Sequence, residues 1–150
     1  MKSFTVKEII EYAITIEKES FAFYTQASKI IENPEVKKLV TLLAEEEVSH
    51  QNRLLALIKE QKINAAELTK QIKPDTALLE KIVHTPIIVS DSVTADILKI
   101  ALKREKNTEQ IYRMLTSLSD IDSNISRIFE QLCLQEQGHV KKIEYRINHL

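Results

Sequence analysis

Glu47-Val48-Ser49-His50 and Glu136-Gln137-Gly138-His139 repeat one pattern, in which a histidine follows a glutamate by three residues. On an α-helix, side chains three residues apart lie on the same face, about 5–6 Å from each other. A carboxylate and an imidazole placed in this way can bind one metal ion together. Two such pairs that face each other across a bundle of helices could bind two ions.

The hydrophobic pattern predicts four long helices, with one Glu-x-x-His pair on the second and one on the fourth. The first begins at the capping-box sequence Thr5-Val6-Lys7-Glu8 and ends near Asn33-Pro34, where the asparagine can cap the second helix. The second is expected over about residues 35–62, with Leu42 on its buried face, and the third over about 92–117. The fourth is expected from about residue 123 to the C-terminus.

Residues 63–91 have a different pattern from the long helices around them. Short helices are expected to begin at Asn64 and at Pro74, and residues 85–89 should be extended. A connection of this length between two long helices suggests a crossover from one end of a bundle to the other.

The composition limits the alternatives. With one glycine and three prolines in 150 residues, a single domain of long helices is more plausible than a sheet, and Gly-rich phosphate loops are excluded. The net charge of −1 removes the main electrostatic reason to expect nucleic-acid binding. Cys133 is the only cysteine, so the chain has no disulfide and no four-cysteine metal site. Without a signal peptide or a membrane-length apolar run, a cytoplasmic location without membrane contact is expected.

The two halves of the chain share more than the Glu-x-x-His pairs. An alanine, a glutamate and a tyrosine in the first helix recur with the same spacing in the third. The two sets are Ala13, Glu17 and Tyr24, and Ala101, Glu105 and Tyr112.

Distances along the helices bring the glutamates to one level. Glu17 lies about 16 residues before the turn near Asn33, and Glu47 about 14 residues after it, or roughly 24 and 21 Å of helix. Antiparallel helices would therefore place these two glutamates side by side. Glu105 and Glu136 are nearly level by the same count.

Four carboxylates and two imidazoles would then share one buried layer. Burying them would cost many kcal/mol unless positive charge lay among them. Two divalent metal ions would supply that charge. Carboxylates with one imidazole per metal suit iron or manganese and exclude a closed thiolate zinc site.

The ordered set of residues resembles the rubrerythrin branch of the ferritin-like di-iron-carboxylate family. The resemblance covers all four long helices and implies an all-α, ferritin-like antiparallel four-helix bundle with a long crossover between helices two and three. The matching segments are Ala13-x3-Glu17-x6-Tyr24, Leu43-Ala44-Glu45-Glu46-Glu47-Val48-Ser49-His50, Ala101-x3-Glu105-x6-Tyr112 and Leu132-x3-Glu136-x2-His139.

The resemblance also implies a role for each residue at the site. Tyr24 and Tyr112 would lie beside the metals as hydrogen-bond partners of the ligand carboxylates. The implied ligands of two iron ions, or alternatively of manganese, are bridging Glu47 and Glu136, terminal Glu17 and Glu105, and the imidazoles of His50 and His139.

The implied activity is reduction of hydrogen peroxide or dioxygen by a di-iron oxidoreductase, and the implied assembly is a homodimer. Family members that reduce peroxide usually carry a further glutamate three residues after the third-helix ligand, where this chain has Thr108. They also usually carry a rubredoxin-like domain, so the electron donor here would be a separate protein such as a rubredoxin. Two alternatives are a ferroxidase for iron storage or delivery, and a non-catalytic helical interaction module.

Several nearby residues have simpler interpretations. His84 and His149 lack partners at metal-binding spacing and are expected on the surface, and Glu46 is expected to face solvent, as is Glu45. Cys133 is expected to be a small core residue. Gly138 costs about 1 kcal/mol within a helix relative to alanine. It would either permit close helix packing or leave room beside its histidine neighbour.

Overall fold

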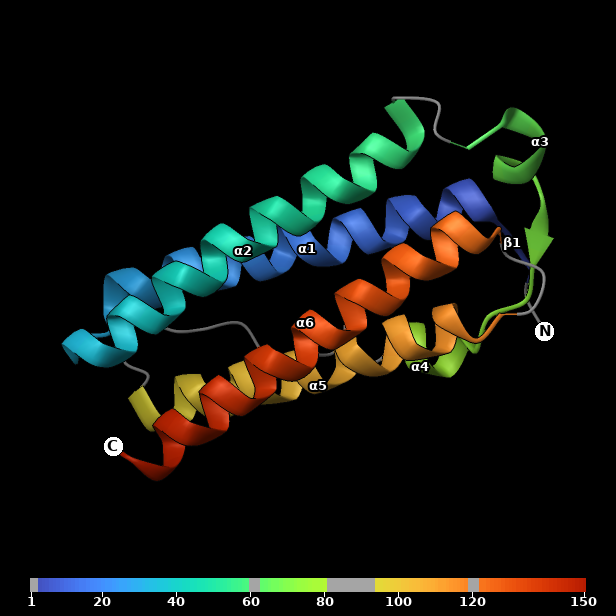
Figure 1. Cartoon of the computed structure of the whole chain (residues 1–150). Helices are drawn as coiled ribbons and strands as arrows, with labels where there is room; N and C mark the ends of the chain where they lie inside the picture. Colours follow the sequence, from blue (N-terminus) through green and yellow to red (C-terminus); the bar gives the residue numbers. More distant parts are fainter. Residues whose placement is uncertain (1–2, 60–62, 81–93, 119–121) are drawn as a thin grey trace.

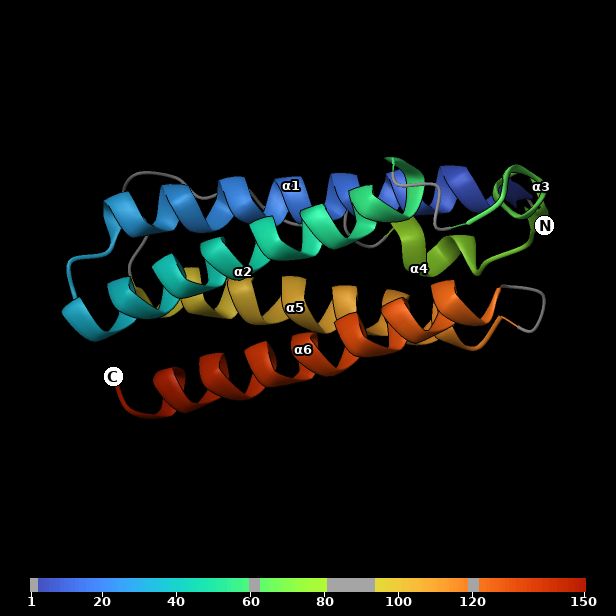
Figure 2. The ribbon, with the colours of Figure 1, turned by 45° about the horizontal axis from the view of Figure 1, so that its top comes forward.

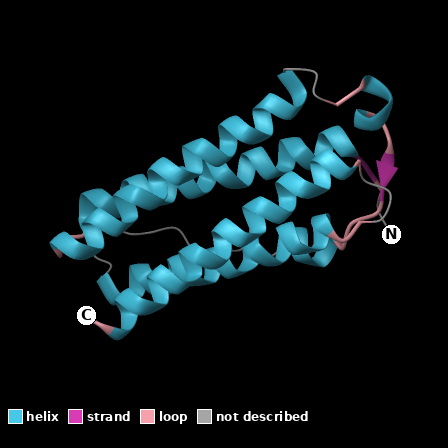
Figure 3. Ribbon diagram, viewed as in Figure 1, coloured by secondary structure: helices cyan, strands magenta, loops and turns pink. Residues whose placement is uncertain are grey.

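In the computed structural model, which describes residues 3–59, 63–80, 94–118 and 122–150, four long helices form a bundle (Figure 1). Two short helices and a two-residue strand pair lie at one end of it (Figure 3). The long helices are α1 (Val6–Ile30), α2 (Pro34–Lys59), α5 (Thr94–Thr116) and α6 (Ser123–Asn148). The short elements are α3 (Ala65–Leu68), α4 (Thr76–Glu80), β1 (Phe4–Thr5) and β2 (Gln71–Ile72).

The local signals in the sequence place the helix starts correctly. The Thr5 side chain accepts a hydrogen bond from the Glu8 N–H, and the Glu8 carboxylate accepts one from the Thr5 N–H, which completes the capping box. Asn33 caps α2, because its side-chain Oδ1 accepts hydrogen bonds from the backbone N–H groups of Glu35 and Val36 in the first turn. These caps fix where each helix begins and therefore the height at which its inner residues lie.

The helices form two antiparallel hairpins, α1 with α2 and α5 with α6 (Figure 1). Because α2 ends at one end of the bundle and α5 begins at the other, the chain must cross over between them, as the sequence predicted. The extended stretch expected at residues 85–89 lies outside the described residues. At the end of the bundle, β1 pairs antiparallel with β2 through Phe4 and Ile72, and the Val6 N–H donates to the Lys70 carbonyl.

The bundle interior contains two separate clusters of apolar side chains. One includes Ile9, Leu54 and Phe129 and lies toward the end that carries the strand pair. The other includes Leu43 and Leu98 and lies toward the opposite end. The buried charged side chains of the long helices lie between the two clusters, so both ends of that polar layer are covered by apolar packing.

The prediction that Leu42 lies on the buried face of α2 is wrong. Leu42 is 40% exposed, whereas Val36 and Val40, which the sequence pattern did not select, are buried. The helical period explains the correction, because Leu39 and Leu43 define the buried stripe and a residue one position before Leu43 is rotated by about 100°. In the described part of the chain, no helix combines the length and the apolar character needed to cross a membrane.

Candidate metal centre

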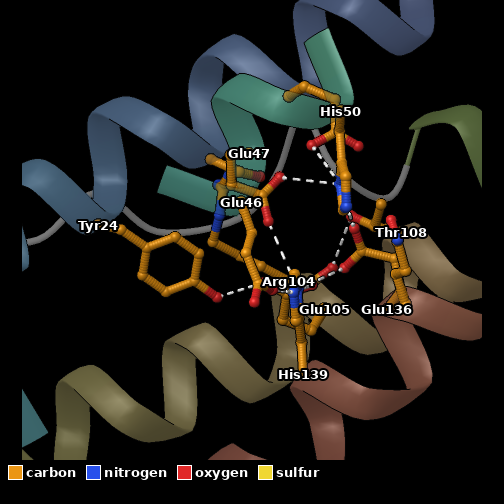
Figure 4. A network of polar contacts seen from close by, with 12 residues as sticks. Tyr24, Glu46, Glu47, His50, Arg104, Glu105, Thr108, Glu136 and His139 are labelled. Atoms are coloured by element: carbon orange, nitrogen blue, oxygen red, sulfur yellow. Dashed lines mark hydrogen bonds and ion pairs between the residues drawn. The ribbon is translucent and has the colours of Figure 1, made fainter. Parts of the chain in front are cut away.

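Six buried side chains from all four long helices meet in the layer between the two apolar clusters (Figure 4). The helix starts and the antiparallel pairing bring them to one level, because each lies near the middle of its helix. Their exposed fractions lie between 0% and 3%. They are Glu17 on α1, Glu47 and His50 on α2, Glu105 on α5, and Glu136 and His139 on α6.

The six side chains form two overlapping groups of four. In each group, one potential ligand atom from every residue lies within 4.8 Å of the others. Glu47 and Glu136 belong to both groups. The remaining members are Glu17 and His50 in one group and Glu105 and His139 in the other. A bridged pair of ions requires two carboxylates that are shared between two groups of ligands, and the cluster has this arrangement.

The imidazoles face the carboxylates through their Nδ1 atoms. His50 Nδ1 lies 3.3 Å from Glu17 Oε2 and 3.4 Å from Glu136 Oε1. His139 Nδ1 lies 3.4 Å from Glu136 Oε2 and 3.5 Å from Glu47 Oε1. The two rings are nearly parallel, with centroids 5.7 Å apart. Each ring therefore presents one nitrogen to the middle of the cluster.

Several atoms that point into the cluster have no hydrogen-bond partner within the described chain. These atoms lie close to opposite charges, but without the distance and direction of hydrogen bonds. Leaving buried polar atoms unsatisfied costs about 1–3 kcal/mol each, and more when they are charged. Cations at the centre would satisfy all of them, so the residues present fit a pair of divalent metal ions. The atoms are Glu17 Oε2, Glu47 Oε1, His50 Nδ1, both oxygens of Glu136, and His139 Nδ1.

The protonation of the cluster reflects burial and crowding. Burial, together with the charges of Glu136 and Glu17, raises the pKa of Glu47 well above its usual value. Burial would lower the pKa of His50, but contacts with Glu136 and Glu17 outweigh it and raise the pKa to about 9. The pKa of His139 is likewise raised to about 9, against the effect of burial. Without metal, the imidazoles therefore serve as the cations of this layer.

Two buried tyrosines donate hydrogen bonds to carboxylates of the opposite half of the chain. The Tyr24 hydroxyl on α1 donates to Glu105 on α5, and the Tyr112 hydroxyl on α5 donates to Glu17 on α1. Burial is the main reason that the pKa of each hydroxyl is raised, so both remain protonated donors. Each bond fixes one oxygen of its carboxylate and leaves the other free to face the cluster.

Replacing Tyr24 by phenylalanine should weaken metal binding about 10- to 100-fold, because Glu105 loses the donor that orients it. Competition with a chelating indicator would measure the affinity. Tyr145→Phe on α6 is the control, since Tyr145 is 53% exposed and stacks on His149. Equal affinities of the Tyr24→Phe variant and the parent protein would contradict an orienting role.

Glu46 was expected to face solvent, but its side chain instead reaches from α2 to α6 and is only partly exposed. Its carboxylate contacts His139 Nε2, on the side of the ring opposite the cluster, and its side chain is 35% exposed. The hydrogen bond to His139 lowers the pKa of Glu46. Its other oxygen lies 3.9 Å from Lys142 Nζ. A carboxylate on the far nitrogen fixes the tautomer and orientation of an imidazole whose near nitrogen binds metal.

Arg104 is a buried cation beside the cluster that no pattern in the sequence had singled out. Its guanidinium donates to Ser20 Oγ at 3.3 Å and lies 5.1 Å from the centre of the Phe23 ring. Burial lowers the pKa of Arg104, while the negative charges around it, including Glu47, raise it. Arg104 follows the exposed Lys103 in a charged stretch, so the sequence does not indicate which of the two side chains is buried.

The structure also describes most of the other residues that the sequence analysis discussed. The Thr108 hydroxyl is buried and donates to the Arg104 carbonyl at 2.9 Å, within its own helix. Close packing does not explain Gly138, because a Cβ atom there would have no heavy atom within 4 Å. Cys133 is a buried free thiol of the core, as predicted. His149 is exposed, and His84 lies outside the described residues.

Comparisons with known proteins agree with this arrangement. A family model described as rubrerythrin matches residues 8–144. A crystal structure from Thermotoga maritima, described as a candidate ferritin-like diiron-carboxylate protein, superposes with a TM-score of 0.77 at 23% sequence identity. The match covers 99% of this chain and 97% of the other, so the all-α, ferritin-like fold is confirmed. A search of curated proteins found no match.

Proposed function

This chain belongs to the rubrerythrin family of di-iron-carboxylate proteins, and from that premise we propose that it is a redox protein that reduces hydrogen peroxide or dioxygen. The observation that supports the proposal best is the set of buried, unsatisfied ligand atoms in two overlapping groups. Carboxylate oxygen and imidazole nitrogen are donors that iron and manganese accept. We propose iron as the resident metal, with manganese as the alternative.

The predicted ligand roles follow the two groups. Glu17 and His50 would hold one ion, and Glu105 and His139 would hold the other. Glu47 and Glu136 would bind both, because each belongs to both groups. Six protein ligands leave coordination positions open on two ions that accept about six ligands each, so a small oxidant could bind there.

When bound, a ferrous pair supplies two electrons, which together with two protons reduce hydrogen peroxide to two molecules of water. The protein's contribution is to hold the carboxylates in place and to exclude bulk water. The hydroxyls of Tyr24 and Tyr112 stay protonated and anchor Glu105 and Glu17. The apolar clusters on either side of the layer keep the carboxylates away from bulk solvent. Burial of the polar layer strengthens each electrostatic interaction within it.

The electrons must be replaced after each turnover. The 150 residues contain one cysteine, Cys133, so no four-cysteine iron site lies among them. We therefore propose a separate electron-donor protein, such as a rubredoxin.

Rapid mixing of the fully reduced, iron-loaded protein with hydrogen peroxide or with dioxygen tests the proposal. A single-turnover rise in ferric absorption is expected with at least one oxidant, and a faster reaction with peroxide would indicate peroxidase function. Steady-state consumption of peroxide should follow when a reductant is added. If neither oxidant changes the absorption of the reduced protein, the redox function is wrong.

Ferroxidase activity for iron storage or delivery is the second candidate, and Thr108 favours it. Peroxide-reducing proteins that this chain resembles usually carry a glutamate at this position, whereas the Thr108 hydroxyl here is used within its own helix. A reaction with dioxygen that is faster than the reaction with peroxide would support this candidate. Particle size by light scattering would show whether a storage cage forms.

Replacing Thr108 by glutamate should raise the rate of peroxide reduction, because it adds an ionisable oxygen donor to the layer. An increase on the order of a hundredfold is expected, near the lower end of what a positioned acid–base group contributes. Thr108→Gln is the matched control, because it adds the same volume without the carboxylate. Equal peroxide rates for the two variants would show that the carboxylate has no such effect.

A further inference from the structure

A cavity of about 310 Å³ lies between α2 and α6, directly outside the metal-ligand cluster. These two helices lie side by side along one face of the bundle (Figure 2). Both candidate histidine ligands, His50 and His139, line the cavity. Ser49 and Lys142, which are exposed to solvent, line it as well. The cavity therefore extends from bulk solvent to two of the six side chains that form the cluster.

Two other cavities flank this one along the same pair of helices, and neither reaches the cluster. One is lined by residues such as Leu42 and Tyr145, and the other by residues such as Val48 and Arg53. None of the six cluster residues lines either of them. The cavity at His50 and His139 is thus distinguished from its neighbours by direct contact with the candidate ligands.

Gly138 keeps this cavity open on the α6 side. A glycine in the middle of a helix costs about 1 kcal/mol relative to alanine, and here packing does not require it. The space that a side chain would occupy is free of heavy atoms within 4 Å of the Cβ position. A larger side chain at this position would extend into the cavity, next to His139.

Glu46 lines the same cavity and connects it with the cluster. One of its oxygens contacts the far nitrogen of His139, and the other faces Lys142 Nζ at 3.9 Å. The Lys142 side chain is 49% exposed, so it can turn to solvent and leave this second Glu46 oxygen without a partner at little cost. Glu46 is therefore a partly exposed oxygen donor in contact with a candidate ligand, and a divalent cation that entered from solvent would meet it first.

We propose that the cavity is the passage by which divalent metal ions enter the buried cluster, with Glu46 as the first oxygen ligand and the absence of a large side chain at position 138 as the feature that keeps the passage open. The inference rests on the proposed metal-binding function. The cluster side chains are at most 3% exposed, so an ion needs a defined route through the helices.

The test is the rate at which metal-free protein takes up Co²⁺, followed by the visible absorption of the bound ion. Ser49→Leu and Gly138→Leu narrow the passage from opposite helices and should slow uptake at least about tenfold, with unchanged final stoichiometry. Thr41→Leu and Gly138→Ala are the matched controls, because Thr41 is exposed on α2 outside the cavity and an alanine fits at position 138. Both controls should load at the parental rate. Glu46→Gln should slow uptake with a smaller effect.

The outcomes separate the passage from the function. Parental rates in both leucine variants would overturn the passage and leave the metal site intact. Failure of the parent protein to take up Co²⁺ would overturn the proposed metal function and the passage with it. If Gly138→Leu does not reach the parental stoichiometry, the uptake rate of Ser49→Leu decides whether the passage exists. Ser49 lies on the other helix and is exposed, so this substitution leaves the core unchanged.

Discussion

Replacing Glu136 by glutamine is expected to lower the metal content from about two ions per chain to fewer than about one. Glu136 has no exposed surface, and its two oxygens face different histidines, with Oε1 near His50 and Oε2 near His139. An amide keeps the volume but removes the charge and replaces one oxygen donor by an N–H group. Because Glu136 belongs to both ligand groups, both ions should lose a ligand.

The affinity of the remaining site should fall by more than the 10- to 100-fold that the loss of a hydrogen-bond partner to a ligand typically costs. Elemental analysis after dialysis would measure the content. Glu144→Gln is the control, because Glu144 is an exposed glutamate on the same helix. If Glu136→Gln retains the metal content of the parent protein, Glu136 does not bridge two ions.

The free energy of unfolding of the metal-free protein is expected to fall as the pH rises from about 6.5 to about 9. In the folded protein the pKa of His50 and that of His139 are each about 9, against an ordinary value of 6.5. Below pH 6.5 the imidazoles are protonated in both the folded and the unfolded states, so their contribution to stability is fully present. It is lost as the pH rises through the folded pKa.

The expected loss is on the order of 3 kcal/mol for each histidine across this range. The raised pKa of Glu47 acts in the same direction, because its proton is held more tightly in the folded state. Urea unfolding in the presence of a chelator, repeated from pH 6.5 to pH 9, would measure the change. His139→Asn should reduce the pH dependence by about half. A stability that stays constant or rises over this range would contradict the protonated imidazoles.

The metal-loaded protein should behave in the opposite way. A metal ion binds the neutral imidazole, so protons leave His50 and His139 when the cluster fills and the affinity increases with pH. The same urea experiment with excess metal should therefore show no loss of stability between pH 6.5 and pH 9. The profile without metal reports the protonation of the cluster, and the profile with metal reports whether the cluster binds metal ions.

The features that the sequence predicted are those governed by short-range rules. Thr5 and Asn33 carry the capping signals, and both cap their helices. The rise per residue then brings Glu17 and Glu47 to one level, because each distance is counted from a turn that the caps define. The all-α bundle and its crossover follow from the same periodic pattern, and the family was implied by the resemblance of the ordered motifs; the fold and the family are confirmed.

The features that the sequence did not predict depend on how each helix is rotated about its axis. Leu42 and Val40 differ little in hydrophobicity, and which of them is buried depends on which side of α2 faces the other helices. Glu46 was indistinguishable from the exposed glutamate before it, because its partner His139 lies on another helix. Likewise, the family resemblance implied a carboxylate partner for Tyr24 but did not identify it as Glu105.

Elemental analysis of the metal content tests directly whether the cluster is a di-metal centre. The protein should be prepared from iron-supplied cells without chelators. About two iron atoms per chain are expected, one for each group of ligands. Two manganese atoms would keep the site and redirect the chemistry toward peroxide dismutation. The absence of any metal, with no uptake of added ferrous ion, would contradict a di-metal centre and leave a helical interaction module.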